Sequence, residues 1–180
     1  FGVDKDSVNI VLNGAGINPN YDETWGIVAG DNDSYLAMID FMQNNDLSIP
    51  ANYNYVSTLI DVSSTIDYFC QSTFFIKKDW PTGNSKVWQG GNDSLWRWLS
   101  YDFDSGWGYL GPSHNTLLHA AHPTGNTPQN PPYATLKFRS LLDSEEFRQA
   151  FINRYACLLK NEFSADTVHA AIDRFVDMYT

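Results

Sequence analysis

Residues 79–104 read DWPTGNSKVWQGGNDSLWRWLSYDFD. A tight loop rich in turn residues comes first, at 79–84. Two short runs of β-branched and aromatic residues follow, at 86–88 and 95–101, and a Gly-Gly-Asn-Asp turn joins them. This order predicts an antiparallel β-hairpin that begins directly after the loop.

Helical periodicity dominates the chain before the hairpin. Apolar residues spaced three and four apart predict a helix that is capped at 33–34 and stops near 44–45. Two more stretches with helical periodicity lie within 54–75, and Asp61 and one of the serines at 63–64 are the expected caps. The hairpin is therefore expected to follow a helical region.

The chain after the hairpin is also helical in its pattern. We expect a helix-like segment at 113–121 and then an exposed loop at 122–132, where Pro, Asn and Thr are frequent. A capping sequence at 143–146 opens the next helix, and Ser164 opens the last one. Only a few residues separate these two helices, so we expect them to form an antiparallel pair.

The fold class expected from these elements is α+β, mainly helical, with one short β-hairpin. The 180 residues include 43% hydrophobic residues, which is enough for one core, and we expect a single domain over 1–180. The N-terminal segment 1–31 is expected to be irregular apart from one short strand at 8–12.

Charge and composition restrict the classes of partner. The net charge is −10, which has the wrong sign for a general nucleic-acid binder. No apolar run has the length of a membrane span, and residues 1–6 do not resemble a signal peptide. The aromatic, Asn-, Asp- and Ser-rich composition favours a secreted or cell-surface protein, with a cytoplasmic one as the alternative. Cys70 and Cys157 are expected to be either two buried free thiols or one long-range disulfide.

The polar residues of the loop and the hairpin have a spacing that phosphoryl transfer requires. Asp79 precedes Asn84 by five positions, and Asp102 and Asp104 follow the hairpin. In a protein kinase, an aspartate accepts the substrate hydroxyl proton, an asparagine follows it, and a later aspartate holds magnesium. Asp and Asn are also ordinary turn residues, so spacing alone leaves a purely structural interpretation open.

The same region resembles the CotH kinase family, a group of atypical protein kinases that are secreted or associated with the spore coat. The resemblance covers about 45–180 and is carried by IDYF at 66–69, KDWPTGN at 78–84, LWRWLSYDFDSGWG at 95–108 and FRQAFINRY at 147–155. The tryptophan-rich strand that runs into Asp-x-Asp-x-Gly-x-Gly is the most specific of these phrases. The resemblance implies a fold like the C-terminal, larger lobe of a protein kinase.

The resemblance also implies roles for four residues. Asp79 is the implied catalytic aspartate, which orients the substrate hydroxyl group. Asn84 and Asp102 are the implied cofactor-binding residues, and Asn84, Asp102 and Asp104 the implied magnesium ligands. The implied reaction is transfer of the γ-phosphate of ATP to Ser or Thr of a partner protein, with Mg²⁺ as the metal.

The sequence departs from ordinary kinases in three ways. Lys77 and Lys78 replace the His-Arg pair before the catalytic aspartate, and Asp104 replaces the glycine of the magnesium motif. The third departure is the lack of a glycine-rich loop followed by a strand with a lysine, which forms the small lobe of a kinase. We therefore expect that the small lobe is missing from this fragment, and that the isolated fragment is inactive and binds nucleotide weakly.

Other functions stay open at this point. One alternative is a non-catalytic secreted or cell-surface module that binds protein or glycan through the same fold. A sugar-stacking surface would use Trp25, Trp80, Trp88 and Trp107. A metal site at His114, His119 and His122 has no carboxylate or cysteine at ligand spacing, so solvated histidines are the more common interpretation.

Overall fold

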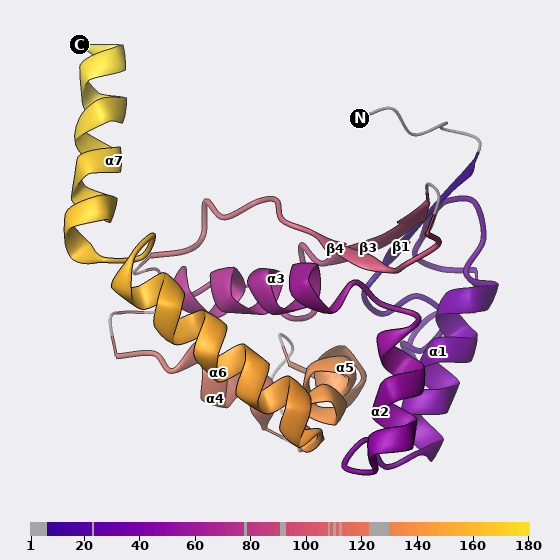
Figure 1. Ribbon diagram of the computed structural model, residues 1–180. Helices are drawn as coiled ribbons and strands as arrows, with labels where there is room; N and C mark the ends of the chain where they lie inside the picture. The colour runs from indigo at the N-terminus through magenta and orange to yellow at the C-terminus, as the bar shows by residue number, and fades with distance from the viewer. Residues whose placement is uncertain are drawn as a thin grey trace.

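A small antiparallel sheet and a set of helices make up the protein. The structure is a computed structural model, and it describes residues 7–22, 24–77, 79–90, 93–107, 109, 111, 113–122 and 130–180. Figure 1 shows the strands on one side of the molecule and the long helices extending away from them. This architecture confirms the expected α+β, mainly helical fold class.

The described residues form four strands in the order β2-β1-β3-β4, and all neighbours run antiparallel. Val11 lies opposite Val87, and Val87 lies opposite Trp98. All three side chains are buried, so this cross-strand row forms the core face of the sheet. The predicted first strand and the predicted hairpin are both confirmed, as β1 and as the pair β3 and β4. The bounds of the strands are β1 (Val8–Leu12), β2 (Ile27–Ala29), β3 (Lys86–Gly90) and β4 (Arg97–Leu99).

The strand β2 is a difference from the expectation that 1–31 holds one strand only. It is three residues long, which is too short for an alternating pattern to be recognised. Gly30 follows it with a φ of 66°. A Cβ atom on Gly30 would lie 2.0 Å from Asn9 Oδ1, so glycine is required for the chain to pass this close to β1.

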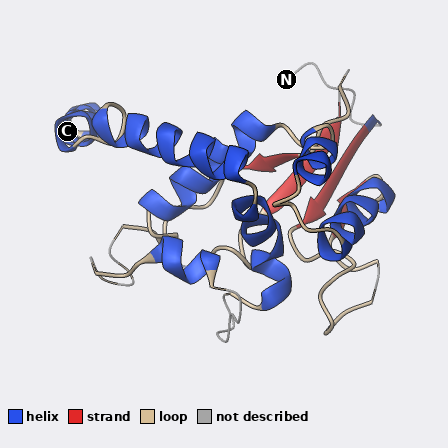
Figure 2. Cartoon of the chain, turned by 60° about the horizontal axis from the view of Figure 1, so that its bottom comes forward, coloured by secondary structure: helices blue, strands red, loops and turns tan. Residues whose placement is uncertain are grey.

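Seven helices occur in the described part of the chain, and Figure 2 shows how they surround one end of the strands and extend beyond it. The cap at Asp61 is confirmed, because its side chain accepts a hydrogen bond from the Ser64 amide at 3.0 Å. The first helix begins at the expected place but without a side-chain cap. The bounds are α1 (Asp33–Asn44), α2 (Pro50–Ser57), α3 (Val62–Phe74), α4 (Thr116–Ala121), α5 (Pro132–Asp143), α6 (Glu145–Lys160) and α7 (Ala165–Tyr179).

The helix α5 is a second element that the sequence did not indicate. Its buried face contains Thr135 and Lys137 beside Phe138 and Leu141. Polar residues on the buried face interrupt the apolar periodicity by which an amphipathic helix is recognised. The same helix contributes directly to the support of the candidate site.

The helix α3 lies at the centre of the core. It contacts α4, α6 and β4, and Figure 1 shows α6 running beneath it. The Phe69 ring lies 4.4 Å from the Phe138 ring and 5.5 Å from the Trp98 ring, measured between centroids. The sheet, α3 and α5 therefore meet in one aromatic cluster, which fixes the loop that leaves α3.

The last helix does not form the expected antiparallel pair. No residue of α7 is buried, and Figure 1 shows α7 leaving the end of α6 at a steep angle. Between the two helices, Phe163 stacks on Phe74 with centroids 4.1 Å apart. This contact holds the turn against the end of α3, and the apolar side of α7, including Phe175 and Val176, is left exposed.

The two cysteines are both free thiols. Cys70 is buried in α3, as expected, but Cys157 is exposed, so the expectation of two buried thiols is wrong for Cys157. The alternative of a disulfide between them is also wrong. Among the described residues, no helix combines the length and apolar character that a membrane span needs.

Candidate functional site

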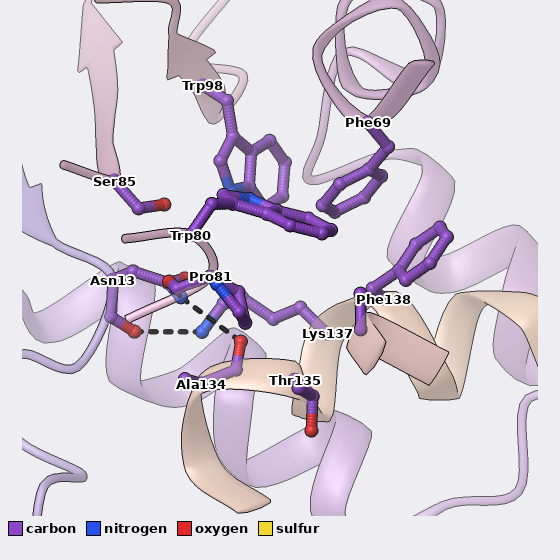
Figure 3. A pocket seen from close by; sticks show the side chains of 11 residues that line it. Asn13, Phe69, Trp80, Pro81, Ser85, Trp98, Ala134, Thr135, Lys137 and Phe138 are labelled. Atoms are coloured by element: carbon purple, nitrogen blue, oxygen red, sulfur yellow. Dashed lines mark hydrogen bonds between the residues drawn. The ribbon is translucent and has the colours of Figure 1, made fainter. Parts of the chain in front are cut away.

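The loop that leaves α3 is anchored by a buried tryptophan. Trp80 is 1% exposed, and its ring lies 6.0 Å from Phe69 and 6.2 Å from Phe138 between centroids. Figure 3 shows these rings together above the polar side chain of Asn13. Asn13 Nδ2 donates a hydrogen bond to the Pro81 carbonyl at 2.8 Å. The loop therefore has a fixed base, and Trp80 is not available for a sugar-stacking surface.

The loop brings the predicted catalytic aspartate and asparagine together. The Gly83 amide donates to the Asp79 carbonyl at 2.6 Å, which closes a tight turn. Asn84 Nδ2 then donates to Asp79 Oδ2 at 3.3 Å. Asn84 has a φ of 50°, a left-handed conformation that Asn adopts more readily than most residues. The five-residue spacing thus places a carboxylate and a carboxamide side by side.

The acidic segment after the hairpin leaves the extended strand conformation. The strand β4 ends at Leu99, and Asp102 has a φ of 56°, so the strand does not continue through Asp104. The two carboxyl groups are nevertheless adjacent. The hydrogen bond with Asp104 raises the pKa of Asp102 most, followed by burial and by the repulsion of the Asp104 charge. Lys77 opposes this increase, and Asp79 adds a smaller one.

Lys77 connects the loop to the acidic segment. Its side chain is 2% exposed, and Nζ donates to the Asn84 carbonyl at 2.6 Å and to the Tyr101 carbonyl at 2.8 Å. The amine also lies 5.1 Å from the centroid of the Tyr101 ring and 4.7 Å from that of Phe103. One side chain therefore links both halves of the candidate site.

Electrostatic interactions also join the two segments. Burial lowers the pKa of Lys77 to about 8, and the charges of Asp102 and Asp79 oppose this decrease. Asp79 in turn contributes to the raised pKa of Asp102. Since these interactions join residues from both segments, Asp79, Asn84, Asp102 and Asp104 lie in one region of the surface, with Lys77 beneath it.

In the sequence, Lys77 stands out only as a departure from ordinary kinases. The available signal was its position, directly after the apolar residues Phe75 and Ile76 and two residues before Asp79. A lysine at the end of a buried apolar run is rarely fully solvated, because its stem follows the chain into the interior. The pattern does not reveal which acceptors such an amine finds.

The other candidates have structural explanations or lack partners for a site. Arg97 makes ion pairs with Asp61 and Asp93, which give it a structural role. The rings of His114 and His119 lie 5.5 Å apart between centroids. Within the described ranges, however, no group of three His, Cys, Asp or Glu residues has the arrangement of a metal site.

Comparison with protein families gives a match. The sequence model of the family described as CotH kinase protein matches residues 7–179, nearly the whole chain. No curated protein and no solved structure matches the chain. The family match includes the loop, the hairpin and the acidic segment that form the candidate site.

Proposed function

Because the chain belongs to the CotH kinase protein family, we propose that it is the larger lobe of an atypical kinase that phosphorylates Ser or Thr on a partner protein. The observation that most supports this function is the link made by Lys77. Its amine bonds a carbonyl of the loop with Asp79 and Asn84 and a carbonyl beside Asp102, which supports the proposal because phosphoryl transfer needs these polar groups close together.

Asp79 is the proposed catalytic residue. One of its carboxylate oxygens accepts the hydrogen bond from Asn84, which holds the side chain in place. The carboxylate is partly exposed, so a hydroxyl group of a substrate can reach it. In this role Asp79 orients the hydroxyl and accepts its proton, while positioning supplies most of the rate enhancement.

The remaining polar groups fit a magnesium ion. Mg²⁺ prefers oxygen ligands and retains several waters, so one or two carboxylates and phosphate oxygens are sufficient. Asp102 and Asp104 supply two adjacent carboxylates whose mutual repulsion a cation would relieve. The amide oxygen of Asn84 would complete this set. When bound, Mg²⁺ would neutralise the charge of the ATP phosphates.

A kinase also covers the nucleotide with a second lobe. The described residues contain no glycine-rich loop that is followed by a strand with a lysine. We therefore propose that a small lobe outside these 180 residues completes the ATP site. Weak binding of ATP by the isolated chain is the expected consequence, because half of the cleft is missing.

The test is phosphoryl transfer by the complete gene product with γ-labelled ATP and Mg²⁺. Casein and the protein itself serve as acceptors. Replacing Asp79 by Asn should reduce transfer by roughly 100-fold or more, because general base catalysis typically contributes that much. The control is Asp173→Asn, which changes an exposed aspartate on α7 and should leave transfer unchanged. Transfer that survives Asp79→Asn would contradict the assigned role.

One observation favours the alternative of a non-catalytic binding module. The side chains of Ile172, Phe175 and Val176 on α7 are exposed, and large exposed apolar surfaces often bind partners. In this case Asp79→Asn would leave partner binding intact, and no transfer would be found in either protein. Secretion or a cell-surface location stays a prediction for both functions.

A further inference from the structure

We propose that Lys77 is a positioning residue, which holds the backbone of Asn84 and Asp102 in the conformations that direct their side chains to one cation. This inference rests on the proposed function and adds a residue that the family match does not assign. It depends on three features: how Lys77 is held, which atoms it contacts, and what its charge alone would do.

The position of Lys77 is set by the end of α3. The Lys77 amide donates to the Ser72 carbonyl at 3.2 Å, and the Ile76 amide donates to the Thr73 carbonyl at 3.3 Å. This pair of bonds is the Schellman arrangement that ends a helix with a left-handed residue. That residue is usually glycine, but here it is Ile76, with a φ of 52°. A β-branched residue in this conformation is a strained outlier, and such strain is concentrated at functional sites.

The acceptors of Lys77 are the peptide groups next to the two residues that it would position. The Asn84 carbonyl is attached to the Asn84 Cα, so its direction is set by the ψ angle of Asn84. The Tyr101 carbonyl belongs to the peptide bond that precedes Asp102, so its direction is coupled to the φ angle of Asp102. Both residues have positive φ, 50° and 56°, which unconstrained Asn and Asp adopt only as a minority. Two short hydrogen bonds from one amine therefore restrain both backbones at once.

The aromatic residues on each side of Asp102 also face Lys77. The Tyr101 and Phe103 rings both lie within cation–π distance of its amine. Lys77 thus contacts the residue before Asp102 and the residue after it. Because the amine is buried, water does not compete for these contacts.

If Lys77 is removed, the loss of its charge and the loss of its hydrogen bonds should have opposite effects on metal binding. An ammonium group close to Asp102 and Asp79 repels a second cation, so removing it should tighten metal binding if charge were its only influence. Loss of positioning should weaken binding instead. The sign of the change therefore separates the two roles.

The experiment measures Mn²⁺ binding, as a probe for Mg²⁺, by titration calorimetry with the 180-residue chain at pH 7. The variant is Lys77→Met, which keeps the length of the side chain and removes its donors. The matched control is Lys160→Met, which removes an exposed lysine from α6. The reference for the site itself is Asp102→Asn. Circular dichroism and thermal unfolding establish that each protein is folded at the temperature of the titration.

We expect Lys77→Met to weaken Mn²⁺ binding by about tenfold or more, while Lys160→Met leaves it unchanged. The double variant Lys77→Met with Asp102→Asn should lose less affinity than the two single variants together predict, because part of the effect of Lys77 acts through Asp102. A purely structural role would not produce this non-additivity. If Lys77→Met does not fold, Lys77→Gln, which keeps an amide donor, is expected to give an intermediate loss.

The outcomes separate this inference from the proposed function. Unchanged or tighter binding by Lys77→Met, with Asp102→Asn impaired, overturns the positioning role only. If Lys77→Met does not fold, unchanged Mn²⁺ binding by Lys77→Gln overturns the positioning role only. Binding that is equal in the wild type and Asp102→Asn overturns both, because no cation site then exists at Asp102 for Lys77 to organise.

Discussion

A second buried lysine gives a prediction for stability. Lys137 lies on α5, is 2% exposed, and Nζ donates to the Asn13 carbonyl and the Tyr35 hydroxyl, at 2.9 Å each. Figure 3 shows this amine directed at Asn13 beneath the loop of the candidate site. Burial lowers the pKa of Lys137 from 10.5 to about 7. A neutral amine has two N–H donors, which the two acceptors satisfy.

The magnitude follows from proton linkage. Between about pH 7 and pH 10.5, the unfolded chain binds a proton at Lys137 that the folded chain does not. The free energy of unfolding therefore rises with pH in this window, by up to about 1.4 kcal/mol per pH unit for one proton. From pH 7 to pH 9 the expected gain is about 2 kcal/mol, since the folded state is half protonated at the start. Below this window both states are protonated, and the contribution of Lys137 is constant.

The assay is urea unfolding of the wild type and Lys137→Met at pH 7, 8 and 9. Other groups that titrate in this range, including Lys77, contribute to both proteins and cancel in the difference. The wild type should gain stability relative to Lys137→Met as the pH rises. Parallel pH dependences, or a relative loss for the wild type, would refute the argument that Lys137 is neutral when folded at high pH.

Two further predictions concern the site and its support. In Asp104→Asn, the pKa of Asp102 should fall towards 3.8, because the hydrogen bond with the Asp104 carboxyl group and the repulsion by its charge are both removed. Carbon-13 NMR of the carboxyl groups measures this pKa. An unchanged pKa would show that the two groups do not interact. Trp80→Ala should lower the free energy of unfolding by about 3–5 kcal/mol, as for other large buried aromatic residues. Tyr179→Ala, at an 87% exposed position, is the control, with an expected change within about 0.5 kcal/mol in urea unfolding. A comparable loss in both variants would mean that Trp80 is not a core anchor.

Local signals in the sequence were sufficient for much of the fold. The hairpin has turn residues between two runs of β-formers, and the helix cap at Asp61 lies next to its helix, so each is determined by neighbours in the chain. Asp79 and Asn84 likewise lie on one short loop, and the hydrogen bond between their side chains is a local contact. These features need no long-range information.

Features that depend on distant contacts could not be predicted in the same way. Lys137 interrupts the apolar periodicity of α5, and its partners Asn13 and Tyr35 are more than 100 residues away along the chain. The apolar periodicity of α7 identifies one face of the helix but does not determine what covers this face. The contact of Phe163 with Phe74 directs the helix away from α6. The role of Lys77 depends on carbonyl groups from two separate segments, which no sequence pattern specifies.

The most direct measurement for the central claim is paramagnetic broadening of backbone amide NMR signals by substoichiometric Mn²⁺. If the loop and the acidic segment hold one cation together, the amides of Asn84 and of 102–104 should broaden in parallel, and Asp102→Asn should abolish both effects. Broadening confined to one of the two segments, or centred on another part of the molecule such as α7, would contradict a shared site.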